Sequence, residues 1–426
     1  MKDFITDILK ASSADGWTVS DQENEGWEFY FIRHRLDQNR VRHTEHITLT
    51  VYKRLEDGKY LGSASAKLSP AADREEARAL VDSLLKEAEL VKNPYYELAP
   101  PADAAAEADT EADVMEIAGD FIRTLKNLPE TGGEDINSYE IFADRIRSRF
   151  LSSTGIDIRY NRTLSKAEVV VNARNEGHEI ELYRMYSSGS CDSRGLAEEI
   201  SRTMQYGRDK LHAQKTPYLG CCDVILSTDA ALEVYRYFID RMSAGLKYQG
   251  ISDWEIGGEV IKGAEGDKVT LEAVRILPNS SENAPYDSEG APRRDLMILK
   301  DGIAVNYFGS RQFSSYLGLE DSFIPGNFAV SGGKKTAAEI RSGRYLEVVE
   351  FSDFQVSAFN GDIFGEIRLG YLHDGDRVTV LEGGSVSGTM REFAKNLLMS
   401  KERKQYDNML IPEITRLADV SITGAE

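Results

Sequence analysis

The first half of the chain repeats one pattern of hydrophobic and polar positions. Apolar residues at positions 4, 5, 8 and 9 have helical spacing and predict an amphipathic helix. Residues 29–32 then begin a strand, a turn at 37–39 leads to a second strand, and alternation over 46–52 predicts a third. Residues 71–91 are rich in Ala, Leu, Glu and Lys and predict a long helix. The predicted order of this unit is α-β-β-β-α.

The same order recurs further along the chain. Helix, strand segments and helix are expected in turn at 114–125, 139–142, 156–160, 167–173, 179–186 and 196–211. Identity between the two copies is slight, so the duplication rests on the pattern alone. Between them, two prolines followed by alternating alanines and acids predict an exposed linker, although Ala and Glu also favour a helical tail. We therefore predict units at 1–98 and 114–214, with a linker at 99–113.

The second half, from about residue 215, has a different pattern. A short apolar strand at Val224–Leu226 runs into Ser227, Thr228 and Asp229, which are residue types that cap helix N-termini. The helical stripe that follows consists of Leu232, Tyr235, Ile239 and Met242, and Gly245 is placed to end the helix. Beyond it, glycines and short β patterns dominate. Residues 215–426 therefore predict a β-rich domain with a core helix, and the whole chain predicts an α+β fold.

Several segments of this half follow one another in a characteristic order. Residues 286–290 read YDSEG and precede an apolar stretch that ends in Asp301-Gly302. Asn327 lies six residues before Gly333, and residues 383–398 (GGSVSGTMREFAKNLL) predict a turn and a last helix. Together with the strand and helix at 224–245, these segments resemble the D-x-E-G turn, the N-x-x-x-x-x-G segment and the closing elements of the TldD/PmbA family. The resemblance covers most of the chain and is clearest from about residue 150 onward.

The resemblance implies a specific loss of chemistry. The core helix of the family's metalloproteases carries a His-Glu-x-x-x-His zinc motif, and counting back from Gly245 places this motif on Arg236, Tyr237 and Arg241. Arginine is always cationic and has no lone pair for a metal. The family's enzymes also take a cysteine ligand from near the C-terminus, but residues 399–412 contain neither cysteine nor histidine. The resemblance therefore implies the PmbA/TldE branch, the non-catalytic partner of TldD, with no catalytic residue, metal or cofactor of its own.

Composition narrows the classes of partner. The 71 acidic and 51 basic residues give a formal charge of −20, which disfavours nucleic acids and anionic membrane surfaces. The family's older label, modulator of DNA gyrase, is therefore not interpreted as contact with DNA. Three cysteines do not make a disulfide framework, and no apolar run approaches the length of about 18 residues that spans a membrane. The first residues are acidic and amphipathic, unlike a signal peptide, so we expect a cytoplasmic protein.

Two residue groups remain as candidate sites. Asp287 and Glu289 flank the turn at Gly290, and we expect a structural turn, with contact to a bound peptide as the alternative. Arg236 and Arg241 are five residues apart, about 140° around an ideal helix, so they do not share a face. Ordinary ion pairing is one interpretation. The other is that an anion or a peptide carboxylate is held where the family's zinc lies.

Three functions are compatible with these observations. The leading hypothesis is a PmbA/TldE-type subunit that assembles with a zinc-bearing, TldD-like subunit and contributes substrate-binding walls for the degradation of unfolded peptides. The alternative is a stand-alone homodimer that binds a peptide or a small anion without cleaving it. A third possibility is a divergent hydrolase with a site that the sequence does not reveal.

Overall fold

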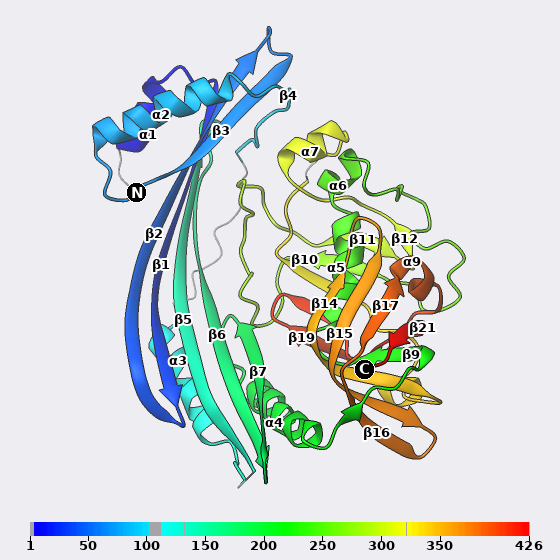
Figure 1. Ribbon diagram of the computed structural model, residues 1–426. Coiled ribbons are helices and arrows are strands. Elements are labelled where there is room, and N and C mark those ends of the chain that lie inside the picture. The colour runs from blue at the N-terminus through cyan, green and yellow to red at the C-terminus, as the bar shows by residue number, and fades with distance from the viewer. Residues whose placement is uncertain (1–3, 102–111, 132, 321, 426) are drawn as a thin grey trace.

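The computed structural model describes residues 4–101, 112–131, 133–320 and 322–425. A long, curved sheet stands beside a C-terminal part that is built from two sheets of mostly shorter strands around a helix (Figure 1). The fold is α+β, as the sequence predicts. The predicted linker at 99–113 falls mostly outside the described residues.

Two successive units of the same element order make up the N-terminal half. The first consists of α1 (Phe4–Ala11), β1 (Gly16–Ile32), β2 (Arg35–Leu55), β3 (Tyr60–Leu68) and α2 (Arg74–Ala88). After the short β4 (Asn93–Pro94), the second consists of α3 (Val114–Lys126), β5 (Glu134–Ser152), β6 (Asp157–Asn175), β7 (His178–Ser188) and α4 (Ser193–Lys210). The predicted duplication of an α-β-β-β-α unit is confirmed. The exact domain boundaries at 98 and 114 remain predictions.

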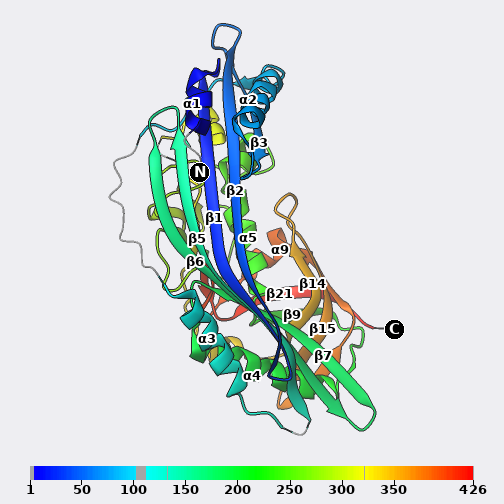
Figure 2. The same cartoon turned by 90° about the vertical axis from the view of Figure 1, so that its left-hand side faces the viewer.

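Both units contribute to a single antiparallel sheet. Its strand order is β4-β3-β2-β1-β5-β6-β7, and the two units join where β1 pairs with β5. Val19 and Phe29 lie an even number of residues apart on β1, so they point to the same face. Val19 packs with α1 and α2, and Phe29 packs with α3 and α4. All four helices therefore cover one face, a pair near each end of the long strands (Figure 2).

Two local predictions about these strands are wrong, and one strand was missed. The predicted turn at 37–39 lies inside β2, because the chain reverses earlier, at Arg33 and His34, which both have positive φ. Residues 157–160 and 167–173 are not separate strands but parts of β6, which pairs with β5 along nearly its whole length. The strand β3, with the sequence YLGSASAKL, was not predicted, because alanine, serine and glycine give little β signal.

The C-terminal half contains two further sheets. The first comprises β8 (Gln214–Lys215), β9 (Gly220–Leu226), β14 (Tyr345–Val356), β15 (Asp362–Asp374), β16 (Arg377–Glu382), β17 (Ser385–Thr389), β18 (Leu398–Met399) and β21 (Thr415–Thr423). The additional pairing of β14 with β15 closes the ring β14-β9-β21-β17-β15 into a barrel. The second sheet comprises β10 (Leu271–Val274), β11 (Leu296–Lys300), β12 (Ile303–Ala304), β13 (Asn327–Val330), β19 (Arg403–Tyr406) and β20 (Met409–Pro412).

Short helices complete this half. They are α5 (Ala231–Arg241), α6 (Ala244–Tyr248), α7 (Arg311–Tyr316), α8 (Ala337–Ile340), α9 (Met390–Phe393) and the 3-10 helix η1 (Ala394–Asn396). The helix α5 shares one hydrophobic core with residues of both sheets, so the predicted core helix is confirmed. In the described part of the chain, no helix combines the length and the apolar character that crossing a membrane requires.

The predicted ends of the core helix need correction. The helix stops at Arg241, and Ser243 then caps α6, so Gly245 lies inside α6 and does not end α5. At its start, Ala230 occupies the N-cap position without a side-chain hydrogen bond. The backbone carbonyls of Thr228 and Asp229 accept hydrogen bonds from the first helical N–H groups, so these residues act through their backbone.

Candidate functional site around the core helix

Arg236 and Arg241 occupy very different environments. The side chain of Arg236 is 51% exposed and pairs with Glu233, one turn earlier on the same helix. The side chain of Arg241 is only 1% exposed, because the hairpin between β14 and β15 and the rings of Tyr237 and Trp254 enclose it. The two guanidinium groups therefore do not form one site.

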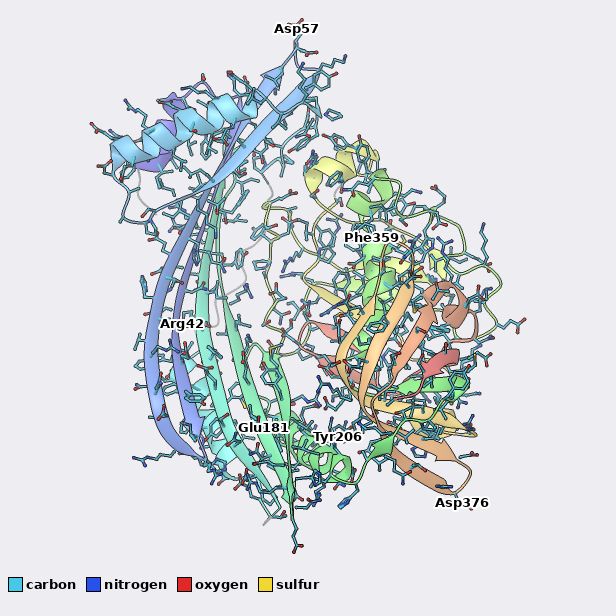
Figure 3. All side chains as sticks on the ribbon, in the orientation of Figure 1. Arg42, Asp57, Glu181, Tyr206, Phe359 and Asp376 are labelled. Atoms are coloured by element: carbon cyan, nitrogen blue, oxygen red, sulfur yellow. The ribbon has the colours of Figure 1, made fainter. Side chains whose placement is uncertain are left out.

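Arg241 is held by several partners. Its Nη1 atom donates to the backbone carbonyls of Ala358 (3.0 Å) and Phe359 (3.2 Å), which lie in the hairpin that joins β14 to β15. The Nη2 atom donates to the carboxylate of Asp253. Such charge-assisted hydrogen bonds offset much of the cost of burying a cation. Figure 3 labels Phe359 in this hairpin. Arg241 thus fixes the hairpin against α5.

Aromatic rings surround the guanidinium group. Its central carbon lies 5.6 Å from the ring centroid of Tyr237 and 5.0 Å from that of Trp254, within the range of cation–π attraction. The two rings pack edge to face. Burial raises the pKa of the Tyr237 phenol, and the nearby cations Arg241 and Arg391 only partly oppose this shift. Tyr237 is therefore a neutral core residue and not an acid–base group at ordinary pH.

The sequence did not reveal two of these partners. Asp253 and Trp254 follow α6 by only a few residues, but nothing in their local pattern points to the helix. Asp253 also lies 3.6 Å from Arg391 in α9, so it bridges the buried cation and an exposed one. The sequence could have indicated only that an acidic residue lies beside Arg241, because a buried arginine requires an acidic partner.

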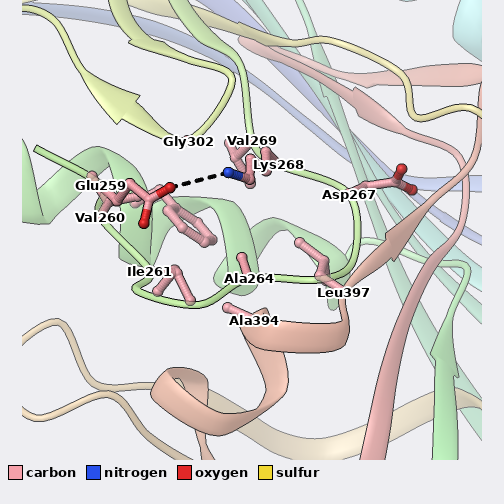
Figure 4. A pocket seen from close by; sticks show the side chains of 11 residues that line it. Glu259, Val260, Ile261, Ala264, Asp267, Lys268, Val269, Gly302, Ala394 and Leu397 are labelled. Carbon is pink, nitrogen blue, oxygen red and sulfur yellow. Dashed lines mark hydrogen bonds and ion pairs between the residues drawn. The ribbon is translucent and has the colours of Figure 1, made fainter.

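One cavity beside this helix is very small. Phe238, Val260, Val269 and Leu397 lie among its lining residues, and its volume is about 10 Å³ (Figure 4). Such a volume holds about one water molecule. An ion pair between Lys268 and Glu259 lies at its edge, with 3.2 Å between the nitrogen and the oxygen. This cavity therefore has no room for a peptide or an organic cofactor.

The turn at 287–290 joins the two halves of the molecule. The carboxylate of Asp287 is buried and accepts backbone hydrogen bonds from Glu289 (2.9 Å), Ala291 (2.9 Å) and Ile324 (2.8 Å). Gly290 has a φ of +83°, and a Cβ atom there would lie 2.8 Å from the ring of Phe150 on β5. A glycine is therefore required at this position for both conformation and space.

Glu289 lies on the other side of the same turn. One of its oxygens accepts a hydrogen bond from the backbone N–H of Arg311, at the start of α7 (2.7 Å). Burial raises the pKa of both the Asp287 and the Glu289 carboxyls, and the backbone N–H groups that donate to each oppose this shift. The partners of both carboxylates are backbone groups that fix loops, which is the arrangement of a structural turn.

This geometry predicts a graded loss of stability. Replacement of Asp287 by alanine leaves three buried N–H groups without their acceptor, and we expect it to lower the free energy of unfolding by roughly 3 kcal/mol or more. Asp287→Asn keeps one oxygen and should cost less. Ser288→Ala, in the exposed centre of the same turn, is the control and should have almost no effect. Urea titration followed by circular dichroism measures all three, and equal stabilities of the three variants would contradict the prediction.

Comparison with known proteins identifies the fold and the family. Residues 219–424 match the family described as PmbA/TldA metallopeptidase C-terminal domain. The metalloprotease PmbA of Escherichia coli O157:H7 is 21% identical over 218 residues, which are 48% of this chain and 46% of that protein. The crystal structure of TldE from Thermococcus kodakarensis matches 99% of both chains with a TM-score of 0.79 at 15% identity. The C-terminal half of the chain belongs to the TldD/PmbA family, and the whole chain has the fold of TldE.

A second solved structure has the same fold. A protein of Thermotoga maritima, described as a candidate modulator of a DNA gyrase, matches 99% of both chains with a TM-score of 0.77 at 15% identity. At such identities the structural likeness shows the fold alone. The match to the curated PmbA protein spans about half of that protein's length, so its activity does not transfer directly.

The residues to which the resemblance assigns the family's zinc motif do not fit a metal ion. Among the described residues, no group of three or more His, Cys, Asp or Glu side chains is arranged to hold one. The buried guanidinium of Arg241 already brings a positive charge to this place, and a divalent cation beside it would be repelled. His43 and His46, the closest histidine pair, lie on β2 and are three residues apart, so they point to opposite faces.

Proposed function

We propose that this chain is a cytoplasmic PmbA/TldE-type subunit without a zinc site of its own, which works beside a zinc-bearing, TldD-like subunit. The pair would degrade or trim unfolded peptides, with the metal and the general base on the partner. This chain would supply walls of the shared substrate space. The observation that carries the proposal is Arg241, because a buried cation, held through its Nη1 and Nη2 atoms, stands where the resemblance would place a metal ligand.

The same geometry weakens the alternative of a stand-alone anion-binding protein centred on Arg241. Its guanidinium is 1% exposed and already contacts two carbonyls and one carboxylate. An anion from solvent would instead meet Arg391, whose side chain is 57% exposed and lies beside Asp253. Peptide binding by this chain therefore fits a surface that is completed by a partner better than a pocket on the helix itself.

The test separates the two functions. We expect the protein purified without chelator to contain far less than one zinc per chain by elemental analysis, and to leave a labelled, denatured casein uncut. Adding a TldD-like subunit from the same genome should give a mixed oligomer by light scattering and cleavage that a chelator abolishes. A partner whose motif glutamate is changed to glutamine is the control and should bind without cutting.

Two outcomes would contradict the proposal. Chelator-sensitive cleavage by the isolated chain, with about one zinc bound, would show that it holds its own catalytic centre. A homodimer that persists unchanged when the TldD-like subunit is added, with no effect on that subunit's cleavage, would favour the stand-alone binding protein.

A further inference from the structure

A second cavity lies in the N-terminal half, away from the core helix. Its volume is about 360 Å³, within the range of small-ligand pockets. It is lined by the beginning of β1, the end of β2, the beginning of β3, the turn between β5 and β6, and residues 95–98. Both repeated units therefore contribute to it, at the end of the long sheet that carries α1 and α2 (Figure 1).

Aromatic and aliphatic side chains form one part of the wall. These are Tyr52, Tyr95, Tyr96, Leu61 and Leu98. Polar and charged groups form the rest, and the surface that the wall exposes is more polar than apolar, so a polar ligand suits the cavity better than a purely apolar one.

The wall is fixed by contacts with the C-terminal half. Tyr96 is buried and packs edge to face on Tyr316 of α7, with 6.0 Å between ring centroids. The hydroxyl of Tyr316 donates to the carbonyl of Pro94 (2.7 Å), and the Nε of Arg311 donates to the carbonyl of Glu97 (3.2 Å). Hydrogen bonds from α7 therefore hold the segment 94–97 on both sides of Tyr95 and Tyr96. The cavity is formed without a ligand.

Two opposite charges at the rim of this cavity, Arg54 and Glu97, belong to exposed residues and have no counter-ion in the described part of the chain. The guanidinium of Arg54 lies over the ring of Tyr95, 5.3 Å from its centroid, and no described carboxylate lies within 4.0 Å of it. The carboxylate of Glu97 likewise has no described cationic partner. Asp15, the other acid in the lining, is engaged by the backbone N–H of Arg54 (2.8 Å) and lies 3.8 Å from the ammonium of Lys53.

We propose that this cavity binds a small zwitterion with an aromatic or aliphatic side chain, such as a free amino acid or a dipeptide. Arg54 would pair with the carboxylate, and Glu97 with the ammonium group, whose attraction to the tyrosine faces adds to the binding. The side chain would lie against Leu61 and Leu98. A polyanion such as a nucleotide does not suit the site, because Asp15 and Glu97 both oppose its charge.

The test uses three probes that share one ring. They are L-phenylalanine, L-phenylalaninamide, which lacks the carboxylate, and 3-phenylpropionate, which lacks the ammonium group. By isothermal titration calorimetry on the full chain, we expect L-phenylalanine or glycyl-L-phenylalanine to saturate one site, and each analogue to bind at least tenfold more weakly. Arg54→Gln should weaken L-phenylalanine at least tenfold and leave L-phenylalaninamide unchanged. Glu97→Gln should weaken L-phenylalanine similarly and leave 3-phenylpropionate unchanged.

Controls distinguish this site from general effects on the fold. Arg78→Gln removes an exposed arginine of α2 and should change nothing, whereas Leu98→Trp fills the cavity and should abolish binding of all probes. Absence of saturable binding by either L-phenylalanine or glycyl-L-phenylalanine to the wild-type protein would overturn the proposal. Equal binding of the three probes, unaffected by Arg54→Gln, would overturn the zwitterion assignment, because only the rings would then be recognised. Neither result affects the proposed role beside a zinc-bearing subunit.

Discussion

Replacing Arg241 by alanine is expected to lower the free energy of unfolding by roughly 3–5 kcal/mol, a loss typical of removing a large, buried and hydrogen-bonded side chain. The change would leave the carbonyls of Ala358 and Phe359 without their donor and open a void between the rings of Tyr237 and Trp254. Buried carbonyls without a partner are costly in themselves.

Arg236→Ala is a matched control on the same helix. Arg236 makes one ion pair at the surface, and such pairs contribute about 0–1 kcal/mol. The two arginine variants should therefore differ by several kcal/mol in urea titrations, although both remove one positive charge. Arg241→Met preserves much of the volume but not the hydrogen bonds, so its stability should lie between those of wild type and Arg241→Ala.

The outcome would show what the degenerate motif contributes. If Arg241→Ala and Arg236→Ala have equal, small effects, the buried guanidinium does not support the hairpin between β14 and β15. In that case Arg241 would be no more than a tolerated replacement. A large difference would mean that the helix has acquired a structural core where its relatives need room for chemistry.

Local pattern was sufficient for the long helices and for the repeated order of the two units, but not for the ends of individual strands or for their pairing. The duplicated unit was predictable because strand alternation and helical spacing depend only on residues that are a few positions apart in the sequence. The joining of both units into one sheet was not, since it depends on pairs such as Trp27 with Ala143, more than a hundred residues apart. The turn at Arg33 and His34 escaped prediction because neither residue is a usual turn former at positive φ.

The candidate site was predictable only in part, for the same reason. The spacing of Arg236 and Arg241 indicated that they would face different surroundings, and the YDSEG sequence indicated a turn. The partners that decide their roles come from distant segments. Arg241 meets Ala358, which is 117 positions later, and Asp287 meets Ile324. No single-sequence pattern encodes such contacts.

Restoring the zinc motif is expected to produce neither a metal site nor a peptidase. The change is the triple substitution Arg236→His, Tyr237→Glu and Arg241→His. A catalytic zinc needs three protein ligands and one open position, and this variant supplies two imidazoles at most. Among the described residues, no cluster of three or more His, Cys, Asp or Glu side chains could supply the remaining zinc ligand.

The geometry of α5 makes even two ligands difficult to combine. The segment is α-helical from Ala231 to Arg241, so side chains at 236 and 241 point about 140° apart. One position is exposed and the other is in the core. Bringing both imidazoles to one ion would require a local π-type distortion, which α5 does not have. Each imidazole would also lack an acceptor for its second nitrogen, which typically lowers metal affinity by about 10–100-fold.

The triple variant should instead be less stable than Arg241→Ala. It removes the same guanidinium and in addition places a glutamate at position 237, where the native side chain is almost fully buried. A carboxylate there loses its hydration without gaining the cation that Arg241 supplied. Arg236→His alone is the control and should be close to wild type in stability. Elemental analysis, urea titration and cleavage of denatured casein with and without chelator give the three readouts. Robust, chelator-sensitive turnover by the triple variant, free of any partner subunit, would show that a third ligand and its supporting acceptors are within reach of α5, and that only these three side chains separate this chain from an active enzyme.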